Sequence, residues 1–92
     1  MYTYRIPKYK MTLATYTQAE NMVVEHATRA LLKGNIHYYE VVIERYSEKA
    51  KRYQPYLNVQ AFRLRDGGIN VFSKKFNITM SKAQAEKFLM DH

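Results

Sequence analysis

Residues 57–76, with the sequence LNVQAFRLRDGGINVFSKKF, constrain the fold of this chain more than any other segment. Two runs rich in β-branched and aromatic residues flank Asp66-Gly67-Gly68, and the glycines supply the positive φ values that a tight turn needs. The segment therefore predicts a β-hairpin. A two-residue loop at either Asp66-Gly67 or Gly67-Gly68 gives the same two faces. These faces are Phe62, Leu64, Ile69 and Val71 on one side, and Val59, Ala61, Arg63, Phe72, Lys74 and Phe76 on the other.

The hairpin must belong to a small domain that folds by packing alone. The chain has 92 residues and no cysteine, so its core is modest and it has no disulfide, thiolate nucleophile or cysteine-based metal site. We expect a single domain over residues 1–92, and cysteine usage fits a cytoplasmic protein. The sequence begins with polar residues and has no apolar run of membrane-spanning length, so we expect neither a signal peptide nor a membrane partner.

The first third of the chain predicts a strand followed by a helix. Residues 2–15 are rich in Tyr, Thr and Ile, and Pro7 places this strand at a sheet edge or breaks it near residue 7. We expect Thr17 to cap the helix, with Glu20 completing a capping box. Gly34, in a left-handed conformation, is expected to end it.

Residues 36–53 fit two interpretations. At about 100° per residue, one half of a helical wheel is apolar and only Val41 is clearly misplaced. The apolar half consists of Ile36, Tyr39, Val42, Ile43, Tyr46, Ala50 and Tyr53. We therefore predict a second helix, capped by Asn35 and ended by Pro55. A strand over 36–46, favoured by β-branched propensity, is the alternative.

The predicted fold is a small α+β domain. A last helix begins after the N-cap Ser81 and directs Ala85, Phe88 and Leu89 inward. The element order is then β-α-α-β-β-α, with a three-stranded antiparallel sheet and helices packed on one face. If 36–46 is a strand, the order becomes β-α-β-β-β-α.

The sequence contains no catalytic signature. It has no glycine-rich phosphate loop, nucleophile motif or metal-ligand set of accepted spacing. His37, Glu40 and Glu44 share one face of the predicted second helix, but they also suit a solvated helix surface. We therefore expect no enzyme activity, no cofactor and no metal.

The charge is concentrated in two segments. The chain carries a formal net charge of +7, residues 1–19 and 45–75 together carry +9, and the remainder carries −2. A basic surface favours a nucleic acid or an acidic protein surface as partner. The expected fold brings aromatic rings to the same region, where rings would stack on bases while cations neutralise phosphates.

The main functional hypothesis is therefore a non-enzymatic nucleic-acid-binding module that contacts the phosphate backbone through a basic and aromatic sheet face. The expected contact residues are Arg5, Lys8, Lys10, Arg63, Arg65, Phe72, Lys74 and Lys75, with Tyr2, Tyr4 and Phe76 beside them. A secondary basic patch is expected at Lys49, Lys51 and Arg52.

The alternative hypothesis is a small protein-binding inhibitor or adaptor, of the kind that phages and mobile elements encode, acting on a host nucleic-acid-handling complex. Tyrosine is enriched at protein interfaces. The candidate anchors are Tyr38, Tyr39, Tyr46, Tyr53 and Tyr56. Both faces of the predicted hairpin are apolar enough to need cover, so a second copy of the chain is a further candidate partner.

Overall fold

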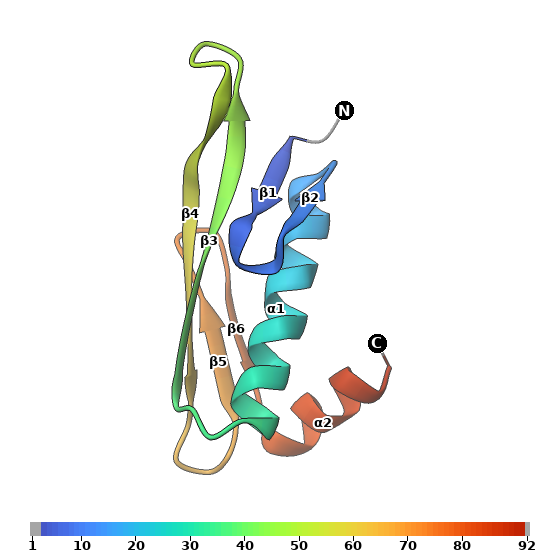
Figure 1. Cartoon of the computed structure of the whole chain (residues 1–92). Coiled ribbons are helices and arrows are strands. Elements are labelled where there is room, and N and C mark those ends of the chain that lie inside the picture. The colour runs from blue at the N-terminus through green and yellow to red at the C-terminus, as the bar shows by residue number, and fades with distance from the viewer. Residues whose placement is uncertain (1–2, 92) are drawn as a thin grey trace.

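The structure is a computed structural model that describes residues 3–91. These residues form one antiparallel sheet and two α-helices (Figure 1). The sheet has six strands in the spatial order β2-β1-β3-β4-β5-β6. The strands are β1 (Tyr4–Ile6), β2 (Met11–Leu13), β3 (Tyr38–Ser47), β4 (Arg52–Arg63), β5 (Ile69–Phe72) and β6 (Asn77–Met80). The helices are α1 (Tyr16–Lys33) and α2 (Lys82–Met90), and a 3-10 turn, η1 (Pro7–Tyr9), joins β1 to β2.

The long β3–β4 hairpin is the centre of the sheet. Its last ladder pair, Ser47 with Arg52, lies beyond the β1–β3 pairing, so the end of the hairpin projects past β1 and β2 (Figure 1). The register shifts once: Ile43 pairs with Leu57, but Glu44 pairs with Pro55. Tyr56 is therefore a bulged residue, and such a bulge redirects a side chain locally.

The core lies between α1 and one face of the sheet. Helix α1 packs along this face (Figure 1), and α2 packs against α1 and β6 at the far end from the projecting hairpin. The fully buried aliphatic side chains include Val23, Ala27 and Leu31 from α1, and Ile43, Val59, Ile69 and Val71 from the sheet. Each fully buried Val, Ile or Leu stabilises the fold by roughly 1.5–3 kcal/mol. Neither helix of residues 3–91 covers the opposite face, which we call the open face.

The prediction of a second helix over 36–53 is wrong. Residues 38–47 form β3, and residues 52 and 53 begin β4. The predicted element order β-α-α-β-β-α and the three-stranded sheet are therefore also wrong, because residues 3–91 form six strands and two α-helices. The alternative order falls short as well, although its strand at 36–46 overlaps β3. Val41, the residue that did not fit the helical stripe, is 3% exposed and lies in the core.

The hairpin prediction has the right segment and the wrong faces. Arg63 pairs with Ile69, so residues 64–68 form a five-residue turn instead of a two-residue loop. A two-residue loop would pair Leu64 with Ile69 or with Val71, and so place these side chains on one face. The odd length of the observed turn shifts the register by an odd number of residues, and such a shift exchanges the two faces of one strand relative to the other. Ile69 and Val71 therefore lie in the core with Arg63 on their side, while Phe62 and Phe72 lie on the open face.

The N-terminal strand prediction is partly replaced. Tyr2 lies outside the described residues. The strand ends before Pro7, where η1 begins, and this is one of the two outcomes that the sequence predicted. However, β1 pairs with both β2 and β3, so β2 and not β1 is the edge strand.

The helix boundaries test the capping predictions. Thr15, not Thr17, caps α1, and Gln18, not Glu20, completes the capping box. Gly34 ends α1 with φ −93°, which is not left-handed; a Cβ there would lie 2.5 Å from the Ala30 carbonyl oxygen, so close approach is the reason for glycine. The Ser81 cap is confirmed, and Ala85 and Leu89 are the buried residues of α2. Neither helix of residues 3–91 combines the length and apolar composition needed to cross a membrane.

Candidate nucleic-acid interface

Three aromatic side chains form a row across the open face. Tyr38 on β3 and Phe62 on β4 are a cross-strand pair with ring centroids 5.0 Å apart. Phe72 on β5 lies 5.8 Å from Phe62, with the two rings 14° from parallel. Tyr38 is 44% exposed and Phe62 38% exposed, so both present ring surface to solvent. We call Tyr38, Phe62 and Phe72 the aromatic row.

Polar side chains adjoin the aromatic row. Asn58 donates a hydrogen bond of 2.8 Å to Glu40, and Gln60 donates one of 3.2 Å to the Tyr38 hydroxyl. These contacts, led by Asn58, hold the pKa of the Glu40 carboxyl below its ordinary value. Amides at such positions present donors and acceptors that match the edges of unpaired bases.

A shallow groove extends the aromatic row toward the β5–β6 turn. The groove has a volume of about 310 Å³. It is lined by Asn58, Gln60, Phe72, Ser73 and Lys74. Lys74 and Phe72 thus line the same groove, and the sequence analysis expected this pair to lie together.

Arg63 does not join them. Its guanidinium lies on the helix side and donates to the carbonyl oxygens of Leu31 and Gly34, the latter at 2.6 Å. The last carbonyls of a helix lack intrahelical partners, so Arg63 caps the C-terminus of α1. Arg65 is exposed in the turn that follows β4.

The basic residues of the N-terminal segment are largely engaged within the fold. Arg5 forms an ion pair of 2.7 Å with Glu44. Lys8 donates to the carbonyl oxygen of Glu40 at 3.0 Å and lies over the Tyr39 ring. Lys10 is exposed, with φ 53°, at the end of η1. Of the three, Lys10 alone makes neither an ion pair nor a side-chain hydrogen bond within residues 3–91.

Most of the excess charge gathers at the projecting end of the sheet. Two segments contribute. The β5–β6 turn lies near the base of the projecting part of the hairpin, with Lys75 5.3 Å from the Tyr56 ring, and the β3–β4 turn lies at its tip (Figure 1). We call this region the basic end. Its six cations are Arg45, Lys49, Lys51, Arg52, Lys74 and Lys75, with Glu48 as the one acidic residue of the same segments.

A cluster of tyrosines supports the basic end on the helix side. Tyr4, Tyr16 and Tyr56 make edge-to-face contacts, with ring centroids 5.8 to 6.3 Å apart. Burial and a hydrogen bond to Glu20 raise the pKa of Tyr16. In contrast, Lys75, followed by Arg45, lowers the pKa of Tyr56. The cluster therefore holds one phenol that sits between two cations.

The remaining tyrosines proposed as anchors differ in position. The Tyr39 hydroxyl lies 2.6 Å from that of Tyr9, and burial raises the pKa of both groups, so this pair belongs to the fold. Tyr46 and Tyr53 pair near the hairpin end, with centroids 5.4 Å apart. Tyr38, on the open face, is the most exposed of the five, and the other four are half-buried.

The part of the chain that the structure describes has no cluster of three or more His, Asp or Glu side chains arranged to hold a metal ion. His37, Glu40 and Glu44, which share a face in the helical interpretation, belong instead to a strand and the residue before it. Glu44 is engaged by Arg5 and Glu40 by Asn58.

Sequence reasoning missed Phe62, Arg45 and the special position of Tyr56. The alternation of Tyr38, Glu40 and Val42 against Tyr39, Val41 and Ile43 was the available signal for β3. Reading it as a strand would have placed Tyr38 on the exposed face. The bulge at Tyr56 has no comparable signal, because Pro55 fits a helix stop equally well.

No protein-family model, curated protein or solved structure matches this chain, so the geometry alone carries the functional argument.

Proposed function

We propose that this chain is a non-enzymatic module that binds single-stranded nucleic acid. In this proposal the aromatic row stacks on bases and the basic end neutralises phosphates. The observation that carries it is the junction at Lys74, where the aromatic row, with two exposed rings and the half-buried Phe72, meets the first cation of the basic end.

The spacing of the rings favours unpaired bases. Neighbouring rings in the row lie 5.0 and 5.8 Å apart, because they stand on adjacent strands. Bases within a duplex are stacked on one another and hide their faces, whereas a single strand can present splayed bases to successive rings. Sheet faces with exposed aromatics bind RNA in this manner.

The charge distribution indicates which way a bound nucleic-acid strand would run across the molecule. The open face itself is nearly balanced, because Glu40 and Glu44 offset Arg5 and Lys8. The basic end has six cations against one acid, so phosphates favour that end of the sheet. A strand seated on the aromatic row would therefore continue past Lys74 toward the β3–β4 hairpin.

The test is a double variant, Phe62→Ala with Phe72→Ala, titrated with a fluorescent oligonucleotide. Loss of a base–ring stack costs about 1–3 kcal/mol per base, so we expect the dissociation constant to rise at least about tenfold. Circular dichroism checks the fold. Val42→Ala is the matched control, because Val42 lies on the same face and is 38% exposed, as Phe62 is, but has no ring.

An unchanged dissociation constant in the double variant would contradict the role of the aromatic row. If instead binding is lost equally in the Val42→Ala variant, the face recognises apolar surface and not bases.

A protein partner is the second candidate, in the form of a small inhibitor or adaptor that acts on a nucleic-acid-handling complex. One observation favours it: Val42 and Leu64, at 38% and 36% exposed, add aliphatic surface near the aromatic row that base stacking does not require. Such surface is typical of protein contacts. Under this candidate, Val42→Ala weakens the interaction and salt has little effect on it.

A further inference from the structure

A second feature of the basic end is a pocket between the β3–β4 turn and the bulge at Tyr56. It has a volume of about 450 Å³. Its walls come from the ends of β3 and β4 and from the turn between them, and it is lined by Arg45, Tyr46, Ser47, Glu48, Lys49, Gln54, Pro55 and Tyr56. We call it the Tyr56 pocket.

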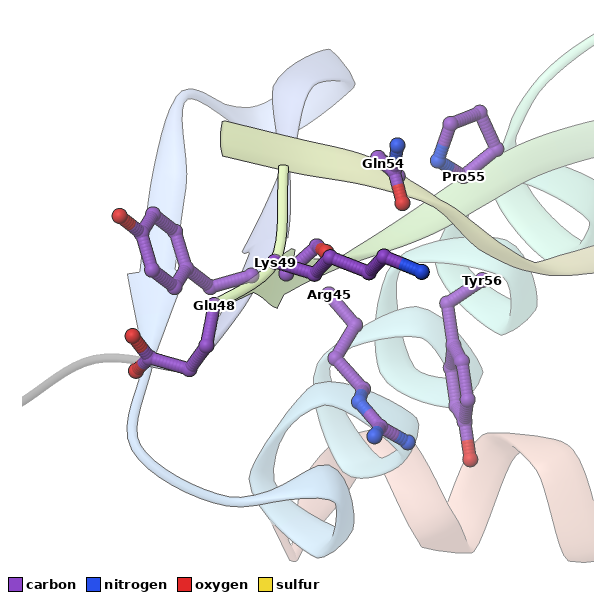
Figure 2. Close-up of a pocket in the computed structure, with 8 residues that line it drawn as sticks. Arg45, Glu48, Lys49, Gln54, Pro55 and Tyr56 are labelled. Carbon is purple, nitrogen blue, oxygen red and sulfur yellow. The ribbon is translucent and has the colours of Figure 1, made fainter. Parts of the chain in front are cut away.

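Cationic and polar groups converge on the Tyr56 pocket. Figure 2 shows Arg45 and Tyr56 projecting side by side, with the Lys49 ammonium reaching toward the space beside Gln54 and Tyr56. The Arg45 guanidinium carbon lies 5.2 Å from the Tyr56 ring centroid. The Lys75 ammonium, from the β5–β6 turn, lies 5.3 Å from the same centroid.

These cations lack anionic partners. Within residues 3–91 the ion pairs are Arg5–Glu44 and Arg29–Glu25, and neither involves a cation of the pocket. Arg45 and Lys75 approach the same ring. The Tyr56 hydroxyl raises the pKa of Lys75 and outweighs the smaller, opposing repulsion from Arg45. A bound anion would relieve this repulsion.

The acidic groups nearby do not fill this role. Glu48 lines the pocket, but its carboxylate points away from Arg45 and Tyr56 (Figure 2). Glu20 accepts a hydrogen bond of 2.9 Å from the Tyr16 hydroxyl. Neither carboxylate forms an ion pair with Arg45, Lys49 or Lys75 in the described part of the chain.

We infer that the Tyr56 pocket binds the terminal phosphate of a nucleic-acid strand. This inference rests on the proposed function and names the part of the strand that the basic end recognises. A guanidinium fork, two ammonium groups and a phenol hydroxyl match the oxygens of a phosphate. A terminal phosphate monoester carries a charge of about −1.5 to −2 at neutral pH, roughly twice that of an internal phosphodiester. Three cations around one pocket suit the larger charge.

The location also favours a strand end. The pocket lies on the hairpin turn, at the end of the sheet, while the aromatic row begins further along β4. Arg45 and Tyr56 lie on the helix side, so a nucleic-acid strand that crosses the open face past Lys74 would reach the pocket by passing over the outer edge of β4. The outer edge of residues 54–59 in β4 has no strand partner within residues 3–91, so no described strand blocks that route.

The experiment compares oligonucleotides of about 12 nucleotides that have a 5′-phosphate, a 3′-phosphate or hydroxyl groups only, with inorganic phosphate as a separate probe. We expect one terminal phosphate to tighten binding to the unaltered chain about tenfold. Arg45→Gln and Lys75→Gln should reduce this gain to less than about twofold. Lys87→Gln, an exposed change on α2 at the opposite end of the molecule, is the matched control and should retain the gain.

A readout that does not depend on oligonucleotide binding is the ring signal of carbon-13-labelled Tyr56, assigned with Tyr56→Phe. Phosphate bound beside the phenol should shift this signal and raise the pKa of Tyr56, because an anion disfavours the phenolate. Arg45→Gln should abolish the shift.

The outcomes separate the two proposals. If phosphorylated and hydroxyl-ended strands bind equally, and Arg45→Gln weakens both alike, the pocket contacts internal phosphates; the terminal-phosphate inference is overturned while the proposed function stands. If inorganic phosphate shifts the Tyr56 signal and no strand binds, the phosphate site stands and the proposed function fails. If neither probe binds, both fail.

Discussion

Replacing Arg63 with methionine tests whether this residue stabilises the fold or contacts a ligand. The guanidinium donates to two carbonyl oxygens, those of Leu31 and Gly34, at the end of α1. Hydrogen bonds from a charged donor contribute about 1.5–3 kcal/mol each, and the cation's interaction with the helix dipole adds about 0.5 kcal/mol. The Gly34 carbonyl lies near solvent and regains water when the donor is removed, so we expect a total loss of about 2–3 kcal/mol.

The assay is thermal unfolding followed by circular dichroism. For a chain of this length, a loss of about 2–3 kcal/mol lowers the melting temperature by roughly 10–20 °C. Arg65→Met is the matched control: it makes the same chemical change two residues away, in an exposed turn, and should change stability by less than about 0.5 kcal/mol. If Arg63→Met leaves stability unchanged and weakens nucleic-acid binding, Arg63 is a ligand contact and the capping argument is refuted.

Three further predictions concern the fold. Thr28 is fully buried and its hydroxyl has no hydrogen-bond partner within residues 3–91, so Thr28→Val should raise the free energy of unfolding by about 1–2 kcal/mol; a loss in urea unfolding would show that the hydroxyl is satisfied. Gly67 has φ +90°, so Gly67→Ala should destabilise the hairpin by about 1–2 kcal/mol, and an unchanged midpoint would contradict the turn geometry. Burial and the Tyr39 hydroxyl raise the pKa of Tyr9 above its ordinary value, so the neutral phenol is favoured in the folded state; stability should hold below about pH 10 and fall as pH rises beyond it. Tyr9→Phe should make that fall shallower in urea midpoints measured from about pH 8 to 11, and an identical slope would contradict it.

The correct sequence predictions rest on local chemistry. Ser81 caps α2 because its side chain accepts the Gln84 backbone N–H at 3.1 Å, an interaction set by four consecutive residues. Pro7 breaks the N-terminal strand for an equally local reason, because proline has no N–H to donate to a ladder. Neither prediction depends on which distant residues pack against the segment.

The wrong predictions depend on distant partners. The segment 36–53 satisfies a helical period, and it becomes β3 and the start of β4 because residues 52–63 pair with it along ten ladder positions. The faces of the second hairpin depend on whether its loop is even or odd in length, which Asp66-Gly67-Gly68 does not determine. Arg63 moved from the candidate interface to a helix cap for this reason.

The candidate site was predictable in composition more than in arrangement. Lys74 and Phe72 do lie together, as neighbours on one β-strand and its turn. The convergence of Arg45, Lys75 and Tyr56 was not predictable, since it joins two segments through a bulge whose position no local pattern marks.

The most direct test of the central claim is a salt titration of the unaltered chain against a labelled single strand and the matching duplex. We expect tighter binding to the single strand, with log affinity falling linearly with log salt. If about four to six phosphates are neutralised, the slope should be roughly −3 to −4. Equal or tighter binding to the duplex would contradict the stacking role of the aromatic row. No binding of either polymer at low salt would contradict the nucleic-acid proposal itself.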